Sequence, residues 1–224
     1  MTSIIPADNE EVFIVNTLLD LVTLKNEKTF KIMGGDGEST DSTVEAAEPY
    51  ALIINTQKRK AKHMNLGAKH TKSKFQYFVH ADMTVSPGAW TTIKVTIAGG
   101  WNSGGFRNAV KTDTKILKWI TRLFHFWLNT KSKAKSKLFY GNNRIFIRKN
   151  VFDKKGGFKE IPIMEGYDYS KRMLASSKVG LISNPKLIED VRRHLKDEFI
   201  RTRIKWRVIK QLYVLGVSPE KLDR

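Results

Sequence analysis

Three aspartates stand where carboxylates could bind a phosphorylated ligand. Asp36 and Asp41 flank a glycine-rich turn. There a carboxylate can accept hydrogen bonds from a base or a ribose, while glycine lets the backbone come close. Asp82 follows an apolar run and ends a His-Ala-Asp sequence, a natural position for a ligand of Mg²⁺ or Mn²⁺ bridging two phosphates. A simpler interpretation stays open, since Asp36 could be only a turn residue and Asp41 only a helix cap.

The elements that would position these aspartates alternate between strand and helix at short intervals. Apolar runs predict strands over 3–5, 30–33, 51–54 and 75–79, with a glycine turn over 34–37 after the second. Helices are predicted from Asn9 to about Val22, from about residue 41 up to Pro49, and over about 60–72. Such alternation predicts an α/β fold with a mostly parallel sheet and helices on both faces. Ligands bind these sheets at the carboxyl ends of the strands, where residues 6–9, 36–41 and 80–82 fall.

The second half of the sequence is less regular. Residues 90–97 have a strand-like composition, but Ser86-Pro87 before them is typical of a helix start, so both alternatives remain. The remaining predictions are a glycine-rich connection over 99–105, helices over 114–128, 165–174 and about 196–215, a buried strand over 145–147 and a turn at Gly156-Gly157. The last helix is amphipathic and strongly basic.

Charge is distributed unevenly along the 224 residues. The net charge is +18, yet residues 1–56 hold ten acidic residues against three lysines. The C-terminal three quarters are therefore expected to meet an anionic partner, either nucleotide phosphates, an anionic membrane or a nucleic acid. The chain has no cysteine, which excludes disulfides, thiolate metal sites and cysteine nucleophiles. It has no apolar run long enough to span a bilayer, and its first residues do not resemble a secretory signal.

Seven motifs in order resemble the family 2 glycosyltransferases, whose fold is GT-A (Rossmann-like). The closest subgroup is the small one described as radical-SAM/selenodomain-associated or arsenosugar-type. The motifs are SIIPADNEE (3–11), DGESTDSTVE (36–45), KAKHMNLGA (60–68), FVHADMTVSPG (78–88), GGFR (104–107), YGNNRIFIRKNVFDKKGGF (140–158) and IPIMEGYDYSKRM (161–173). The resemblance implies a GT-A domain over 1–190, with a basic helical segment over 191–224 that packs on it or extends it.

The resemblance also implies a reaction and a set of site residues. The reaction is sugar transfer from a nucleoside-diphosphate sugar to a hydroxyl, with inversion, assisted by Mg²⁺ or Mn²⁺. Asp36 would bind the nucleoside and Asp82 the metal. Lys60 would add charge near the phosphates or lie on a solvated helix face, and Asn65 would bond the donor or buttress a turn. The other donor-side residues are Pro6, Asn9, Glu10, Gly37, Asp41 and Ala81, and the acceptor-side residues are Arg107, Tyr140, Asn142, Arg192 and Arg193.

Two departures from the family pattern fall on expected carboxylates. Gly166 stands where the family has the aspartate of Met-Glu-Asp, and Asn142 stands where it has the aspartate of Tyr-Gly-Asp-Gln. Glu165 and Asp168 are the candidates to replace the missing base. These departures put activity in doubt, so a catalytically impaired protein that binds a nucleotide or an anionic membrane is the alternative function. A nucleic-acid binder is a lesser alternative, since no recognition motif supports it.

The helix predicted over 114–128 bears on localisation. Its Phe124, Phe126 and Trp127 lie close in sequence to Lys118 and Arg122, which fits peripheral membrane binding, although a core-packing helix explains the apolar face equally well. Membrane contact would suit a lipid-linked acceptor. The sequence therefore predicts a cytoplasmic enzyme, with peripheral binding to the inner face of the membrane as one option.

Overall fold

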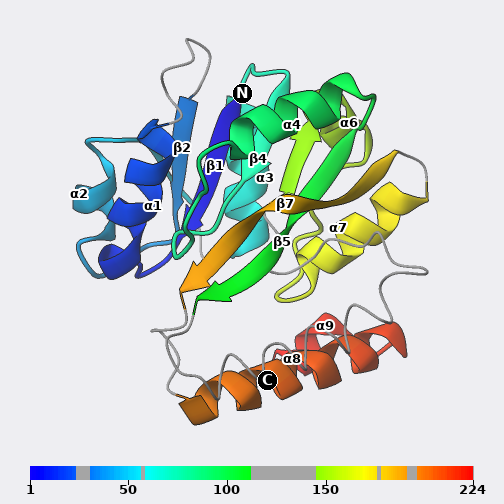
Figure 1. The fold of residues 1–224 in the computed structure, drawn as a ribbon. Helices are drawn as coiled ribbons and strands as arrows, with labels where there is room; N and C mark the ends of the chain where they lie inside the picture. Colours follow the sequence, from blue (N-terminus) through cyan, green and yellow to red (C-terminus); the bar gives the residue numbers. More distant parts are fainter. Residues whose placement is uncertain (24–30, 57–58, 112–144, 176–177, 191–195, 224) are drawn as a thin grey trace.

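A seven-stranded mixed sheet forms the centre of the protein (Figure 1). The computed structural model describes residues 1–23, 31–56, 59–111, 145–175, 178–190 and 196–223. The strand order is β3-β2-β1-β4-β6-β5-β7. All neighbouring strands pair in parallel except β6, which is antiparallel to both β4 and β5. The strands are β1 (Thr2–Ala7), β2 (Lys31–Asp36), β3 (Leu52–Asn55), β4 (Phe75–Phe78), β5 (Ser103–Lys111), β6 (Ile145–Arg148) and β7 (Val179–Asp190). The predicted α/β fold with a mostly parallel sheet is confirmed.

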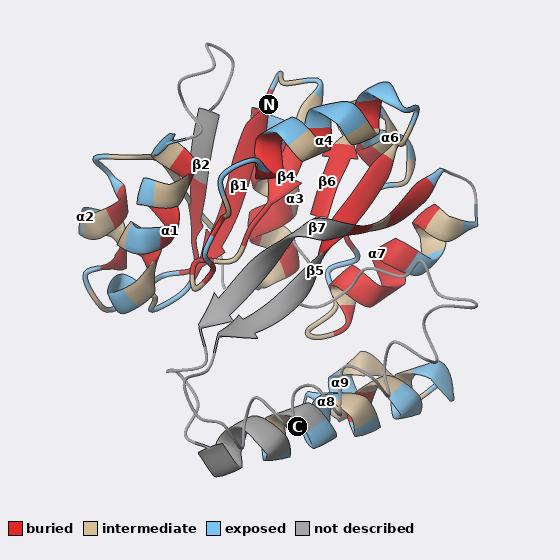
Figure 2. Ribbon diagram, viewed as in Figure 1, coloured by how far each residue is buried: buried red, intermediate tan, exposed pale blue. Residues whose placement is uncertain are grey.

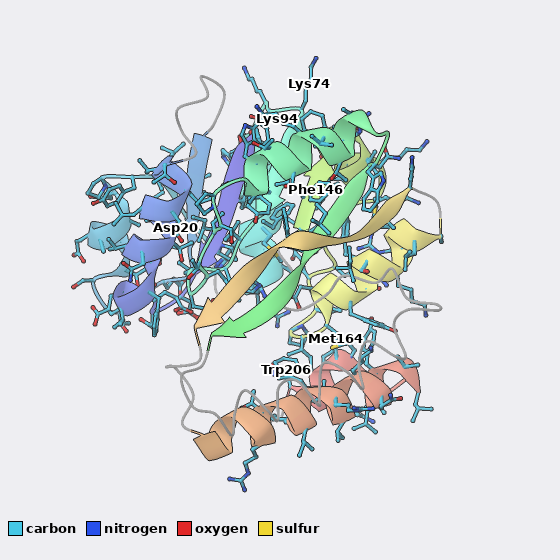
Figure 3. The ribbon with its side chains drawn as sticks, in the orientation of Figure 1. Asp20, Lys74, Lys94, Phe146, Met164 and Trp206 are labelled. Atoms are coloured by element: carbon cyan, nitrogen blue, oxygen red, sulfur yellow. The ribbon has the colours of Figure 1, made fainter. Side chains whose placement is uncertain are left out.

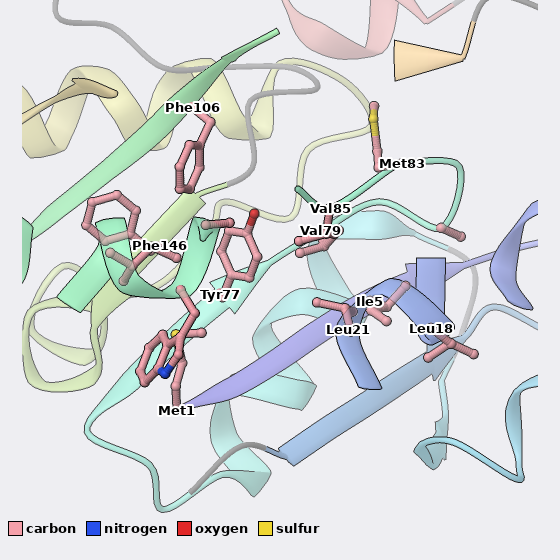
Figure 4. Packing of buried hydrophobic residues seen from close by; sticks show 14 of the residues in the cluster. Met1, Ile5, Leu18, Leu21, Tyr77, Val79, Met83, Val85, Phe106 and Phe146 are labelled. Carbon is pink, nitrogen blue, oxygen red and sulfur yellow. The ribbon is translucent and has the colours of Figure 1, made fainter. Parts of the chain in front are cut away.

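Helices cover both faces of this sheet, because its central strands are apolar on both sides. All six residues of β1 are buried; Ile4 packs in one hydrophobic cluster and Ile5 in another. The cluster around Ile5, drawn in Figure 4, includes residues from α1 and α4, and the cluster around Ile4 includes residues from α3, α6 and α7. The helices are α1 (Glu11–Thr23), α2 (Thr43–Ala47), α3 (Lys60–His70), α4 (Ala89–Ala98), α6 (Lys149–Lys154), α7 (Glu165–Leu174), α8 (Lys196–Val214) and α9 (Pro219–Leu222).

The glycine turn predicted over 34–37 is wrong, because β2 continues through both glycines to Asp36. Helix α3 lies close to Gly35, and the side chain of Ile53 in β3 lies close to Gly34, so a larger side chain fits poorly at either position. A Cβ on Gly35 would lie 2.9 Å from the Cβ of His63, and one on Gly34 would lie 2.8 Å from Cδ1 of Ile53. The glycines therefore serve packing, and they carry the strand as far as the carboxylate of Asp36.

The structure differs from the sequence-based expectations at several places in the second half of the chain. Residues 90–97 belong to helix α4, and the connection expected over 99–105 ends early because β5 begins at Ser103. Gly104 lies in this strand, where a Cβ would lie 2.6 Å from the ring of Phe146. Strand β7 was not predicted. The helix predicted over 114–128 lies outside the described residues.

The remaining predictions for the second half are confirmed. Strand β6 covers 145–147, helix α7 spans 165–174, and Gly156 and Gly157 have φ angles of 72° and 66°, as a glycine turn requires. Helix α8 contacts the start of α7, since Ile209 clusters with Met164, which directly precedes α7, and with Tyr167 in its first turn. Figure 3 shows Trp206 on the side of α8 toward Met164. Of the helices described, none has the length and apolar character needed to cross a membrane.

Candidate active site

A cleft opens where several parallel strands end. Pro6 near the end of β1, Phe78 at the end of β4 and the first residues of α3 and α7 all contribute to its wall. It holds about 300 Å³, including space open to solvent. The residues that line it are Pro6, Lys60, Met64, Phe78, Val79, His80, Ile145, Phe158, Glu165 and Gly166. The cleft therefore brings two predicted donor-side residues, Pro6 and Lys60, together with the candidate base Glu165 from distant parts of the sequence. The other predicted donor-side residues, Asp36 and Asp82 among them, are not among the described residues that line it.

Asp36 organises the loop that follows β2. Its side chain is buried, and its Oδ2 accepts the N–H groups of Glu38 at 3.0 Å and Ser39 at 3.2 Å. Its Oδ1 accepts the hydroxyl of Ser39 at 2.6 Å. The N–H of Gly37 donates to the carbonyl of Ala7 at 3.1 Å, which joins this loop to the end of β1. Asp36 is thus a turn residue at a strand end, and its bonds hold the loop in shape before any ligand arrives.

Asn9 and Asp41 fasten the loop after β1 to the loop after β2. The Oδ1 of Asn9 accepts the N–H of Thr40 at 3.0 Å. One oxygen of Asp41 accepts the N–H and hydroxyl of Thr43, and the other accepts the N–H of Glu11 at 3.3 Å. The hydroxyl of Thr43, with the backbone N–H groups of Glu11 and Thr43, holds the pKa of Asp41 below its usual value. Asp41 therefore joins the N-terminal ends of α1 and α2, from the position before Ser42, which is the N-cap residue of α2.

Glu10 belongs to the same pair of loops through its backbone. Its N–H donates to the hydroxyl of Thr43 at 2.8 Å, and the neighbouring Glu11 accepts the N–H of Ser42 at 3.0 Å. Two loops that each follow a parallel strand are in this way cross-linked into one wall.

Lys60 and Glu165 face each other across the cleft. The Nζ of Lys60 lies 3.4 Å from Oε1 of Glu165, and the Glu165 side chain is 13% exposed. Lys60 begins α3, and Glu165 begins α7, where the positive end of the helix dipole favours a carboxylate. Met164, in the left-handed region with φ 68°, turns the chain into α7. The cleft therefore holds one cation and one carboxylate within reach of the same ligand.

Asp168, the other candidate base, is held by two cations. Its Oδ1 lies 2.9 Å from Nζ of Lys159, and its Oδ2 accepts Nε–H of Arg172 at 2.7 Å. Arg172 also donates to the carbonyl oxygens of Lys155 and Gly157. Asp168 thereby ties the glycine turn to α7, and the described residues that line the cleft do not include it.

Asn65 supports the cleft wall from beneath. Its Nδ2 donates to the carbonyl of Phe158 at 2.8 Å, and its Oδ1 accepts the N–H of the same residue at 2.9 Å. A Cβ on Gly157 would lie 2.7 Å from this Oδ1. Of the two interpretations made from the sequence, this geometry favours the buttress, because both ends of the amide bond the backbone of a cleft residue.

Asp82 lies in a turn that α1 holds in place. The buried hydroxyl of Thr17 is 2.6 Å from the carbonyl of Ala81 and 2.7 Å from that of Met83, and it accepts the N–H of Met83 at 3.1 Å. Asp20, one turn further on, accepts the N–H of Val85 at 2.8 Å. Sequence reasoning missed Thr17; its one signal was a hydroxyl residue within the apolar pattern of a helix.

Asp82 offers a carboxylate to a divalent metal. Asp82 is half-buried, and among the described residues no group of three or more His, Cys, Asp or Glu side chains could hold a metal ion. Mg²⁺ and ions like it often bind through one or two carboxylates and take the remaining ligands from substrate phosphates and water. The donor set at Asp82 fits a metal that arrives with a diphosphate.

Comparison with known families identifies the chain. Residues 2–161 match the family model for Glycosyl transferase family 2. The chain belongs to glycosyl transferase family 2. A search of curated proteins finds no match.

Solved structures agree on the fold. The chain is similar to the mannosyltransferase PcManGT from Pyrobaculum calidifontis in complex with GDP-Man and Mn²⁺ (18% identity, TM-score 0.72, 98% of this chain and 65% of that one). It is also similar to TarS residues 1–349 from S. aureus (14% identity, TM-score 0.62, 99% of this chain and 68% of that one). A third similar structure is glucosyl-3-phosphoglycerate synthase from Mycobacterium tuberculosis in complex with Mn²⁺ and UDP-Glc (15% identity, TM-score 0.61, 96% of this chain and 79% of that one). The GT-A fold expected from the motifs is confirmed; this glycosyltransferase spans about two thirds of the first two of these chains.

The rest of the predicted acceptor side of this glycosyltransferase is only partly described. The backbone of Arg107 lies in β5, at an irregularity in its pairing with β7 between Phe106 and Asn108. Tyr140, Asn142, Arg192 and Arg193 lie outside the described residues.

Proposed function

We propose that the chain transfers a sugar from a nucleoside-diphosphate sugar to an acceptor hydroxyl, with inversion at the anomeric carbon. The observation that carries the proposal is the Lys60–Glu165 pair, 3.4 Å apart in a cleft at the carboxyl edge of the sheet. Inverting transfer needs a base for the acceptor proton and positive charge near the leaving diphosphate. Structures similar to this chain contain GDP-Man or UDP-Glc with Mn²⁺, which supports this donor class. The seven ordered motifs support the radical-SAM/selenodomain-associated or arsenosugar-type subgroup.

The donor would lie along the wall made by the loops after β1 and β2. Asp36 and Gly37 would meet the nucleoside, with Pro6, Asn9, Glu10 and Asp41 keeping the wall in shape. Ala81 and Asp82 would meet the diphosphate, with Asp82 holding Mg²⁺ or Mn²⁺, which when bound supplies charge that stabilises the leaving diphosphate.

Glu165 is our choice for the base. The acceptor hydroxyl would lose its proton to Glu165 as its oxygen bonds the anomeric carbon, and the bond from that carbon to the diphosphate would break on the opposite face. Lys60 would exchange its contact with Glu165 for one with the diphosphate, which leaves the carboxylate available to the acceptor. Asp168 is less suited to this role, because Arg172 and Lys159 already neutralise it.

The second candidate function is nucleotide binding without turnover. The observation that favours it is Gly166, which lines the cleft where a carboxylate was expected and offers no side chain. Both functions share the donor wall, so they differ only in whether Glu165 suffices as the base.

One set of variants separates the two functions. Thermal shifts with UDP-, GDP- and dTDP-sugars, with and without Mn²⁺, report donor binding, and release of nucleoside diphosphate with an acceptor panel reports turnover. Glu165→Gln should keep the thermal shift and lower turnover about 100-fold or more. Asp82→Asn should lose the Mn²⁺-dependent part of the shift. Glu48→Gln, an exposed carboxylate on the C-terminal side of α2, is the matched control and should change neither.

The outcomes are distinct. No thermal shift with any donor overturns the nucleotide-sugar proposal, and a shift without turnover in the wild type favours the second function. Turnover that survives Glu165→Gln excludes Glu165 as the base.

A further inference from the structure

Helix α8 is basic without any acidic residue over most of its length. Residues 201–214 contain five basic residues and no aspartate or glutamate. The chain as a whole carries a net charge of +18. The two acidic residues of this helix, Asp197 and Glu198, stand before the stretch, which is itself basic.

One face of α8 packs against the body of the protein. Ile209 is buried in a cluster with Met164 and Tyr167, and Tyr213 packs on it. The rings of Tyr167 and Tyr213 meet edge to face, with centroids 5.9 Å apart. This contact fixes which side of the helix faces outward, and it agrees with the expectation of a C-terminal helical segment that packs on the same domain or extends it.

The outward face carries an apolar stripe. Ile204, Val208 and Leu212 follow one another at intervals of four residues, and Leu215 continues the row. At about 100° per residue, Ile204 lies about 180° around the helix from the packed Tyr213. These four side chains are 55%, 51%, 36% and 78% exposed, and Figure 2 shows much of this part of α8 in the exposed colour.

Basic side chains accompany the stripe. Arg201 and Lys205 are both exposed, and by the same helical geometry they lie about 60° and 100° from Ile204, within or beside the row. Long basic side chains can lay their stems along apolar surface and keep their charges at a polar boundary. An apolar row flanked by cations matches a boundary between acyl chains and anionic headgroups.

We propose that the outer face of α8 is a docking surface for an anionic membrane. Ile204, Val208 and Leu212 form it with Arg201 and Lys205, and Leu215, directly after the helix, continues it. Charge complementarity favours an anionic membrane as the partner. A second copy of the chain would bring a basic helix of like charge against this one, whereas anionic headgroups attract it. The surface is separate from the helix predicted over 114–128, and it would bind the protein peripherally.

Docking in this way would bring the cleft close to the headgroups. Helix α8 lies beyond the edge toward which β5 and β7 run (Figure 1), and Met164, which α8 contacts, directly precedes Glu165 of the cleft. A lipid-borne acceptor hydroxyl is the substrate class that this arrangement favours. This second step rests on the proposed transferase function, whereas the docking itself does not.

The test is partition of the full chain onto vesicles. Wild-type protein is sedimented with vesicles of phosphatidylcholine alone and of phosphatidylcholine with phosphatidylglycerol, at low and high salt. Val208→Glu places a carboxylate in the stripe, and Val95→Glu is the matched control, an exposed helical valine on α4. We expect binding only to anionic vesicles, weakened by salt, and reduced about tenfold or more by Val208→Glu but unchanged by Val95→Glu.

Thermal melting of both variants shows whether they are folded, and gel filtration reports self-association. Equal vesicle binding by wild type and a folded Val208→Glu overturns the proposal, as does absence of wild-type binding to anionic vesicles. A dimer that Val208→Glu dissociates, without vesicle binding by the wild type, also overturns it and assigns the stripe to a second copy. Donor-induced thermal shifts remain readable in every case, so failure of docking is distinguishable from failure of the proposed function.

Discussion

Asp168→Asn should act on stability, whereas Glu165→Gln should act on chemistry. Asp168 is buried and bonds Arg172 at 2.7 Å, and Arg172 in turn holds two carbonyl groups of the preceding glycine turn. Replacing the carboxylate with an amide keeps the volume and removes the charge. Arg172 then keeps its carbonyl partners but loses its counter-ion.

The expected loss of unfolding free energy in Asp168→Asn depends on how exposed its two partners, Arg172 and Lys159, are. Removing a hydrogen bond to a charged group costs about 1.5–3 kcal/mol. The Arg172 side chain keeps 26% exposure, so the loss stays below the roughly 3–5 kcal/mol of a fully buried broken pair. Lys159 is 58% exposed and adds about 1 kcal/mol at most. We expect a loss of about 2–3 kcal/mol, and therefore a fall in Tm of about 4–12 °C for a chain of this size.

The assay is thermal and denaturant unfolding, together with turnover normalised to folded protein. The matched control is Asp153→Asn, which removes an exposed ion pair to Lys149, four residues earlier on α6. The control should stay within about 0.5 kcal/mol of wild type. If Asp168→Asn melts like Asp153→Asn and loses turnover, Asp168 is catalytic and our choice of Glu165 is refuted.

Two further predictions concern the donor wall. Gly37→Ala would place a Cβ 2.6 Å from the ring of His63; it should cost about 1–3 kcal/mol of unfolding free energy and weaken donor-induced thermal shifts. The loss should be smaller in a His63→Ser background, and equal losses in both backgrounds would contradict this packing argument. Asp41→Asn should lower Tm at neutral pH: because the folded pKa of Asp41 is depressed, its stabilisation is present above about pH 4 and lost as the pH falls further. Melting from neutral pH to pH 3 should show variant and wild type converging, and a constant gap would contradict the role of the charge.

The parallel half of the fold was predictable because its signals are local. Short apolar runs separated by capped helices specify the strands and helices one at a time, and parallel pairing then places their carboxyl ends together. The glycines of β2 were misread because Gly34-Gly35 has the local pattern of a turn. Only the approach of His63 from a distant helix shows that glycine is required within the strand.

The candidate site was predictable to the extent that strand ends define it. Asp36 lies at the end of a strand, although that strand continues three residues beyond the predicted end at Met33. Lys60 and Glu165 line one cleft although 105 positions separate them in the sequence. No local sequence pattern predicts their ion pair. The role of Thr17 could not be predicted from the sequence either, because the turn that it holds lies more than sixty residues away. The hydrogen bonds that the two Asp36 oxygens accept from residues of their own loop likewise depend on backbone geometry, which residue types alone do not specify.

The donor wall and the segment that leads into α7 are held by different kinds of interaction, and this bears on the missing carboxylates. The donor wall depends on short polar side chains that bond backbone groups, as Asp36 and Asn9 do. The segment that leads into α7 depends on charge, through Asp168 and Arg172, and on Asn65, which bonds the backbone of Phe158. Asp168 stabilises this segment from outside the cleft, whereas Glu165 lines the cleft. Because Asp168 already stabilises this segment, glycine at position 166 is compatible with the fold, and in the mechanism that we propose Glu165 supplies the base.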